Sequence, residues 1–152
     1  EVIQEVLYAF SGVKHWLQYV GEHNGVKYYN DSKATNIIAT QTALRSFTNQ
    51  SVILIAGGLD RGNGFDELVP DLTFVSGIVL YGETKEKLQE AAKVASIPVI
   101  EVVNTLEEAT KKAYAISKED DIILLSPACA SWDQFKNFEI RGDEFIRVIE
   151  NL

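Results

Sequence analysis

Short apolar runs alternate with segments of helical periodicity along most of this 152-residue chain, and no other feature limits the possible folds as strongly. Residues 51–56 are apolar after the first position, as in a strand buried on both faces of a parallel sheet. Further strands are predicted at residues 75–81, 99–103 and 121–125, and helices at 33–47, at 83–95, from 106 and from 138. This alternation predicts a doubly wound, Rossmann-like α/β domain with a mostly parallel sheet, right-handed crossovers and helices on both faces.

The N-terminal part of the chain follows a different pattern. Apolar residues with the spacing of one helix face precede Gly12, which is a suitable stop: Ile3, Val6, Leu7 and Phe10. Residues 16–20 and 26–29 are then predicted as two strands joined through His23-Asn24-Gly25, a hairpin signal. Further along, Thr105 and Glu108 have the spacing of a capping box. No internal linker interrupts these patterns, so residues 1–152 are expected to form one domain.

The composition of the chain excludes several classes of protein. A formal net charge of −8 leaves no long basic surface for a phosphate backbone, so no nucleic acid is expected as a partner. No run of about 18 apolar residues occurs, so no membrane insertion is expected. The acidic start is unlike a signal peptide, and the single Cys129 cannot form an internal disulfide. These features favour a cytoplasmic protein, and the missing initiator Met suggests a piece cut from a longer chain.

Polar loops follow three of the predicted strands, at residues 30–36, 57–64 and 126–138. In an open α/β sheet, ligands bind in the crevice beyond the carboxyl ends of the strands, so these loops are the candidate site. Each loop carries a cation, namely Lys33, Arg61 or Lys136, and two loops lead into helix N-termini, which favour anions. In so acidic a chain, cations on one rim predict a small anionic ligand, either a dicarboxylate or a phosphate.

Each of these features also has a simpler structural interpretation. Asp31 could cap the helix that follows, and Gly57-Gly58 could form only a tight exit from a strand. As a phosphate loop, that glycine pair lacks both the dinucleotide spacing and the GKT or GKS of a P-loop. Cys129 could be a nucleophile, but a small buried residue is favoured because its loop contains no His. Two His and one Cys argue against a zinc site, and no metal ligand is assigned.

Three strings carry a resemblance to a known family: NDSKATN at 30–36, GGLDRG at 57–62 and LLSPACASWDQFKNFEIRGDEF at 124–145. In their order and spacing they resemble the signatures of the Mur ligase family, and the last string resembles the members that add D-glutamate to UDP-N-acetylmuramoyl-L-alanine in peptidoglycan precursor synthesis. The resemblance implies a three-domain, ATP-dependent ligase whose first domain holds the UDP-sugar and whose central domain carries the P-loop and magnesium sites. This chain resembles only the C-terminal, amino-acid-binding domain.

The same resemblance implies a reaction. ATP phosphorylates the terminal carboxylate of the nucleotide-linked L-alanine, the amine of D-glutamate attacks the acyl phosphate, and phosphate leaves. The third domain is expected to position D-glutamate, which is catalysis by proximity and orientation. Alone it is expected to be inactive and to hold no cofactor tightly, since ATP and Mg would be bound mainly by the absent central domain.

The resemblance also implies roles for individual residues. The hydroxyls of Thr35 and Ser131, with the backbone at Trp132 and Phe138, resemble the family's D-glutamate pocket. Arg61 stands where the family places a basic residue, sometimes Lys, against the side-chain carboxylate, which Arg can clamp with two parallel hydrogen bonds.

Two further positions resemble the part of the site that faces ATP. Lys33 resembles a catalytic cation facing the reacting phosphates, and Asp31 resembles a contact to the ATP ribose. The sequence departs from the family pattern at Trp16, where Arg is common, and at Trp132, where Leu is frequent. Trp16 cannot form a salt bridge to phosphate, whereas a backbone contact at Trp132 would survive the change.

Other functions remain open from the sequence. A sister ligase would use a different amino acid, although the DQFKNFE segment at 133–139 favours the glutamate enzyme. A stand-alone α/β module could bind small anions without catalysis. An electron-transfer domain that binds a mononucleotide would need a phosphate loop directly after the first strand, where this chain has the hairpin.

Overall fold

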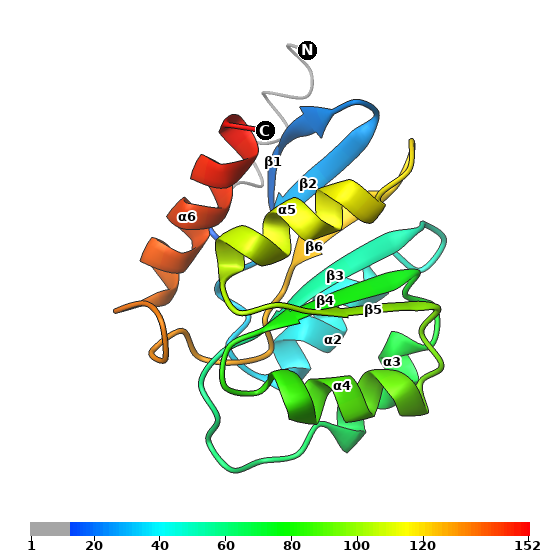
Figure 1. The fold of residues 1–152 in the computed structure, drawn as a ribbon, viewed down its shortest axis with the longest axis vertical. Helices are drawn as coiled ribbons and strands as arrows, with labels where there is room; N and C mark the ends of the chain where they lie inside the picture. The colour runs from blue at the N-terminus through cyan, green and yellow to red at the C-terminus, as the bar shows by residue number, and fades with distance from the viewer. Residues whose placement is uncertain (1–12) are drawn as a thin grey trace.

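The computed structural model describes residues 13–152, and it shows an open sheet with helices packed around it (Figure 1). The helix predicted at residues 3–10 and its stop at Gly12 lie outside the described residues. Among residues 13–152, none of the helices has the length and apolar character needed to cross a membrane.

The sheet has six strands in the order β1-β2-β6-β3-β4-β5. Only the β1–β2 pair is antiparallel, and the pairs β2–β6, β6–β3, β3–β4 and β4–β5 are parallel. The strand bounds are β1 Gln18–His23, β2 Val26–Asn30, β3 Val52–Gly57, β4 Gly77–Tyr81, β5 Val99–Val102 and β6 Ile122–Leu125. The predicted mostly parallel sheet with an antiparallel hairpin at one edge is therefore confirmed.

Helices cover both faces of the sheet, as predicted. The helix bounds are α2 Ile37–Arg45, α3 Val69–Leu72, α4 Lys85–Val94, α5 Leu106–Ile116 and α6 Phe138–Glu150. Apolar side chains of α2, α3 and α4 share one core with the sheet, and those of α5 and α6 share a second core on the opposite face. A short 3-10 helix, η1 (Asp66–Leu68), leads into α3, and neither of these two was predicted.

Strand β3 shows why an uninterrupted apolar run becomes a central strand. Leu54 and Ala56 face the core that contains α2, α3 and α4, whereas Ile53 and Ile55 face the core that contains α5 and α6. All four side chains are almost completely buried, and removing a Leu or Ile side chain from water stabilises the fold by roughly 1.5–3 kcal/mol. A polar residue at any of these positions would be buried in one of the two cores and would weaken the apolar packing there.

The hairpin turn is the one predicted, but its first strand starts later than residue 16. Asn24 and Gly25 have φ values of 53° and 80°, and the paired ends His23 and Val26 leave a two-residue turn with the type I′ preference for Asn-Gly. The backbone N–H of Leu17 donates to the carboxylate of Asp31 and so lies outside the ladder.

Helix α2 also starts later than predicted, at Ile37 instead of residue 33. Its N-cap is Asn36, which has an extended backbone and accepts a hydrogen bond from the N–H of Ala39 through its side chain. Lys33 and Thr35 therefore lie in the loop after β2, and the alternative interpretation of Asp31 as the cap of this helix is wrong. The capping box of Thr105 and Glu108 at the start of α5 is confirmed.

Candidate functional site

The three polar loops follow strands β2, β3 and β6, which are neighbours in the sheet. Because these strands are parallel, their carboxyl ends reach the same edge, and the loops meet there as predicted. We name the loops after the strands they follow: the β2 loop is 31–36, the β3 loop is 58–65 and the β6 loop is 126–137. The candidate site is built from these loops and the first turn of α2.

Two backbone hydrogen bonds join the end of β3 and its loop to the β6 loop. The N–H of Gly57 donates to the carbonyl of Pro127 at 3.1 Å, and the N–H of Leu59 donates to the carbonyl of Ala130 at 2.9 Å. Between them, Gly58 has φ of +150°, and a Cβ added there would lie 2.4 Å from the oxygen of Ala130. Glycine is therefore required for the contact between the two loops, in addition to the tight strand exit expected from the sequence.

Arg141, a residue without a predicted role, is buried next to all three loops. Its side chain is completely buried, and its Nε and Nη2 donate to Ser32, at 2.9 Å to Oγ and 2.7 Å to the carbonyl oxygen. Its Nη1 donates to the carbonyl of Cys129 at 2.9 Å and would lie 3.3 Å from a Cβ on Gly58. Within residues 13–152, no carboxylate lies within ion-pair distance of this guanidinium. One buried cation thus connects the β2, β3 and β6 loops.

The role of Arg141 could have been inferred from the spacing of its helix. Arg141, Phe145 and Ile149 are separated by four residues each, so they share the face of α6 that packs against the sheet. A charged residue on such a face must find polar partners inside the protein, because burying an unsatisfied charge is costly.

Asp31 lies in a second buried network. It is only 3% exposed; its Oδ1 accepts from the N–H of Leu17 at 2.9 Å and its Oδ2 accepts from Oγ of Ser126 at 2.8 Å. Burial raises the pKa of Asp31 to about 6, and the two hydrogen bonds oppose that rise only in part. The carboxylate holds the entry to β1 against the end of β6.

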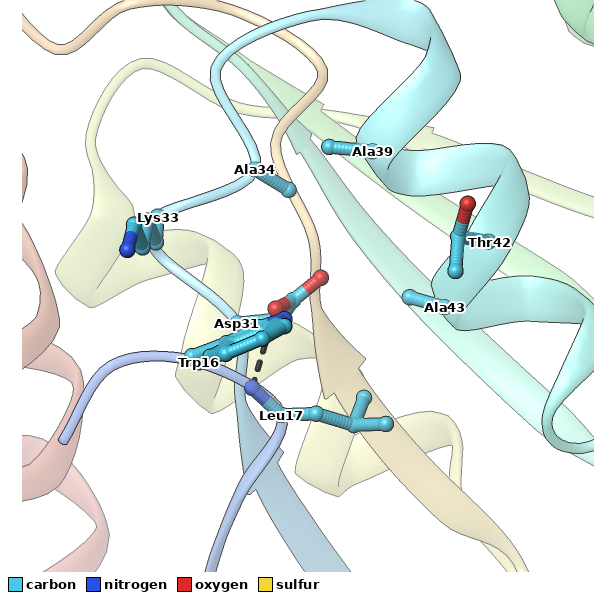
Figure 2. Close-up of a pocket in the computed structure, with 8 residues that line it drawn as sticks. All are labelled: Trp16, Leu17, Asp31, Lys33, Ala34, Ala39, Thr42 and Ala43. Carbon is cyan, nitrogen blue, oxygen red and sulfur yellow. Dashed lines mark hydrogen bonds between the residues drawn. The ribbon is translucent and has the colours of Figure 1, made fainter. Parts of the chain in front are cut away.

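Two neighbouring cavities open at this edge. The first, of about 300 Å³, is lined by Asp31, Lys33 and Trp16 on one side and by residues of α2 on the other (Figure 2). The residues of α2 that line it are Ala39, Thr42 and Ala43. Trp16 is 57% exposed, and the Nζ of Lys33 lies 5.3 Å from the centre of its ring. This cavity offers an aromatic face, a cation and a partly engaged carboxylate.

The second cavity, of about 260 Å³, is lined by Thr35 of the β2 loop and Arg61 of the β3 loop. Its wall also includes α2 near its start, residues 128–130 of the β6 loop, and Leu59, Asn63 and the acidic Glu67. The free N–H groups at a helix N-terminus favour an anion, and Arg61 adds a full positive charge. Neither the Thr35 side chain nor the Arg61 guanidinium has a hydrogen bond or ion pair with any residue between 13 and 152. Both are therefore available to a ligand.

The remaining predicted site residues, Ser131, Trp132 and Phe138, line neither of these cavities. Ser131 is 2% exposed at the start of the turn in the β6 loop, and Phe138 is the first residue of α6, where its carbonyl accepts from Ser32. Trp132 is 61% exposed, and its ring lies against the guanidinium of Arg61.

The prediction that three cations gather on one rim is wrong in its detail. Lys33 lines the first cavity, Arg61 lines the second, and the exposed Lys136 lines neither of them. The sequence pattern could not show this division, because the side chain of Trp16 and the start of α2 determine where each cavity lies. Because each of two adjoining cavities has one cation, the site could bind two anionic groups, one in each cavity.

The chemistry available in the second cavity is binding and orientation. Cys129 lines this cavity, is 4% exposed, and has a pKa raised to about 11 by burial, so its thiol stays protonated near neutral pH. The prediction of a small buried residue at Cys129 is confirmed. Within the described part of the chain, no three His, Cys, Asp or Glu side chains are grouped so that they could hold a metal ion.

Comparison with known proteins places this architecture in a family. Residues 16–129 match the family described as "Mur ligase, glutamate ligase domain". The chain is 57% identical to UDP-N-acetylmuramoylalanine–D-glutamate ligase of Streptococcus suis and 59% identical to that of Bacillus cereus, over all 152 residues. In both cases the matched region covers 100% of this chain and 34% of the relative, so the chain spans about a third of the length of these relatives.

Solved structures at low sequence identity share the fold. UDP-N-acetylmuramate-alanine ligase MurC from Thermotoga maritima superposes with a TM-score of 0.65 at 16% identity, over 97% of this chain and 32% of that one. MurF ligase from Thermotoga maritima in complex with ADP superposes with a TM-score of 0.59 at 17% identity, over 91% and 31%. At these identities the similarity concerns the fold alone, and it agrees with the open, mostly parallel sheet.

Proposed function

This chain belongs to the Mur ligase family, and from that premise we propose that it is the C-terminal domain of the member that adds D-glutamate to UDP-N-acetylmuramoyl-L-alanine. Relatives named for that reaction are 55–59% identical over the whole chain, which supports the proposal. The longer protein would be a three-domain, ATP-dependent ligase of peptidoglycan precursor synthesis in the cytoplasm. The preceding domains would hold ATP, magnesium and the UDP-linked substrate, and this domain alone would be inactive.

In the proposed reaction, the amine of D-glutamate attacks an acyl phosphate formed from the nucleotide-linked L-alanine, and phosphate leaves. The contribution of this chain is to hold both carboxylates of D-glutamate so that only the amine projects toward the acyl phosphate. Fixing a reactant in this way lowers the entropic cost of the chemical step. No general base with a shifted pKa is required from the second cavity.

The observation that carries the proposal is the second cavity itself. Thr35 and Arg61 come from different loops, line the same cavity beside the start of α2, and have no hydrogen-bond or ion-pair partner within residues 13–152. We assign the side-chain carboxylate of D-glutamate to these two residues, since guanidinium and hydroxyl donors both bind carboxylate oxygens. Ser131 and the backbone at Trp132 and Phe138 are assigned to the other carboxylate.

The first cavity would face the nucleotide. Lys33 is assigned to the reacting phosphates, and Asp31 to the ribose of ATP. Both residues line this cavity together with Trp16, which supports the assignment (Figure 2). The buried hydrogen bonds of Asp31 limit its share in that contact, since its carboxylate already accepts from Leu17 and Ser126.

The test is steady-state kinetics of the full-length ligase with Thr35→Ala and Arg61→Ala. Each variant is expected to raise the KM for D-glutamate by about 10- to 100-fold, because the loss of one hydrogen bond to a charged group costs roughly 1.5–3 kcal/mol. Lys112→Ala is the matched control, because it removes one exposed positive charge on α5 and should change nothing. A KM for D-glutamate that stays unchanged in both site variants would refute the assigned pocket.

A further inference from the structure

Trp132 and Arg61 form a contact that the proposed function does not use. The Cζ atom of Arg61 lies 5.0 Å from the centre of the Trp132 ring, and the tryptophan is 61% exposed. We infer that the Trp132 side chain is a positioning residue, which holds the guanidinium of Arg61 at the rim of the second cavity with its N–H groups directed to a carboxylate. The inference rests on the proposed function for the identity of that carboxylate as D-glutamate.

The backbone beneath the pair determines that these two side chains meet. The hydrogen bond from Leu59 to Ala130 joins the two loops, and Arg61 and Trp132 each lie two residues beyond it. Gly58 permits this approach, because any Cβ there would collide with the oxygen of Ala130. The contact between Arg61 and Trp132, which we call the stack, therefore extends a connection between the two loops that the backbone hydrogen bond already fixes.

Two nearby carboxylates, those of Asp60 and Glu83, are engaged in other hydrogen bonds. Glu67 also lines the second cavity, but the structure shows no ion pair between it and Arg61. Asp60, the adjacent residue, accepts from Nζ of Lys87 at 2.9 Å and from the N–H of Gly62 at 2.8 Å through the same Oδ1. The N–H of Asp60 donates to Glu83 at 3.1 Å, which fixes the loop from the other side. Within residues 13–152, the indole of Trp132 is the one partner of the guanidinium that the structure shows.

The planar shapes of the Arg61 guanidinium and the Trp132 indole explain how their contact can help ligand binding. A guanidinium is planar and can lie face-on against an indole while its N–H groups remain in the plane, free to donate two parallel hydrogen bonds. An exposed Arg otherwise occupies many rotamers, and a ligand must then order it on binding. A side chain that is held before the ligand arrives lowers that entropic cost. The effect should therefore appear in the KM for the amino acid and not in kcat.

The test is a double-mutant cycle in the full-length ligase. Trp132→Leu is expected to raise the KM for D-glutamate about 3- to 5-fold with kcat unchanged, and Trp132→Phe should recover part of that loss because it keeps an aromatic face. In the Arg61→Ala background, Trp132→Leu should change KM less than 1.5-fold, since the group it positions is gone. An equal increase of KM in both backgrounds, or none in either, overturns the inference.

The cycle separates failure of the inference from failure of the proposed function. If Arg61→Ala alone leaves the KM for D-glutamate unchanged, the carboxylate assignment is wrong. If Arg61→Ala raises KM while Trp132→Leu does not, the pocket stands and Trp132 has no positioning role.

A second measurement tests the stack without any substrate. The ¹⁵N indole signal of Trp132, identified by its loss in Trp132→Phe, should shift when Arg61 is changed to Ala in the ligand-free full-length enzyme. The indole signal of Trp16 is the internal control, because that ring contacts Lys33 in the other cavity and should not move. A Trp132 signal that stays in place in the Arg61→Ala variant shows that the stack is absent in solution, and the inference then fails.

Discussion

Two arginines at the carboxyl edge of the sheet are built in opposite ways. Arg141 is completely buried and donates to Ser32 and Cys129, whereas Arg61 is exposed and contacts the ring of Trp132. We call the two buried networks, one around Arg141 and Gly58 and the other around Asp31, the floor of the site, and the exposed groups Arg61 and Trp132 its rim. The floor joins the loops to one another, whereas the hydrogen-bond donors of the rim are free to bind a ligand.

The energetic consequence of this difference is a division of roles. A buried polar group that loses its partner costs about 1–3 kcal/mol, because water cannot replace the lost hydrogen bond. An exposed contact between a cation and an aromatic ring contributes only about 0.5–1 kcal/mol. Changes in the floor should therefore act on stability, and changes in the rim should act on ligand binding. The following predictions test that division, beginning with the largest expected effect.

Replacing Arg141 by Leu should lower the free energy of unfolding by about 3–5 kcal/mol, because the carbonyls of Ser32 and Cys129 lose their buried donor. Arg141→Lys should lose less, since an ammonium group can still reach one of these oxygens. Urea denaturation of the chain measures both changes. If Arg141→Leu costs less than 1 kcal/mol, the floor does not depend on this cation.

Replacing Gly58 by Ala should cost about 2–4 kcal/mol, since the new Cβ meets the oxygen of Ala130 at 2.4 Å and the backbone has φ of +150°. Gly62→Ala is the matched control. Gly62 also has a positive φ, of +88°, but no atom lies within 4 Å of its added Cβ, so only the backbone strain of about 1 kcal/mol applies. Equal losses in the two variants would mean that the contact between the loops is not tight.

Asp31 should make stability depend on pH. Its pKa is raised from 3.8 to about 6 in the folded chain, so the folded state binds the proton more tightly than the unfolded state does. The contribution of Asp31 to the free energy of unfolding should therefore be most favourable below about pH 4. It should fall as the pH rises to about 6 and stay constant above that, a total loss of roughly 3 kcal/mol.

The measurement compares the parent chain with Asp31→Asn in urea denaturation from pH 4 to pH 7. The amide can still accept from Leu17 but does not titrate, so the difference in stability between the two chains should change with pH in the stated direction. A constant difference across this range would show that the carboxyl is not desolvated.

The smallest expected effect is that of Trp132→Leu on stability. The ring is mostly exposed and belongs to the rim, so the free energy of unfolding should change by less than about 0.5 kcal/mol. Thermal and urea unfolding measured beside Arg141→Leu give the comparison directly. A loss above 1 kcal/mol would show that Trp132 is part of the structural floor and would contradict the distinction between floor and rim.

Much of the architecture could be predicted from the residues because the signals are local. The apolar run of β3, the Asn24-Gly25 turn and the capping box of Thr105 each depend on chemistry within a few positions of the chain. The start of α2 was misplaced because residues 33–35 carry no strong helix breaker, and only the capping hydrogen bond of Asn36 shows that the helix begins after it. Helix α3 has only four residues, and its apolar pattern is too short to recognise.

The features of the candidate site also fall into two groups: those set by neighbouring residues and those that depend on contacts between distant residues. The sequence by itself determined the parallel sheet, the strand-end loops and their polar residues, because periodicity and loop composition are properties of neighbouring positions. Only the tertiary structure decided that Thr35 and Arg61 share one cavity, that Lys33 lines another, and that Arg141 connects the loops from below. Those relations join residues up to 109 positions apart, as between Ser32 and Arg141, and no local pattern encodes them. They arise when parallel strands bring distant loops to one edge and buried polar groups must find their partners there.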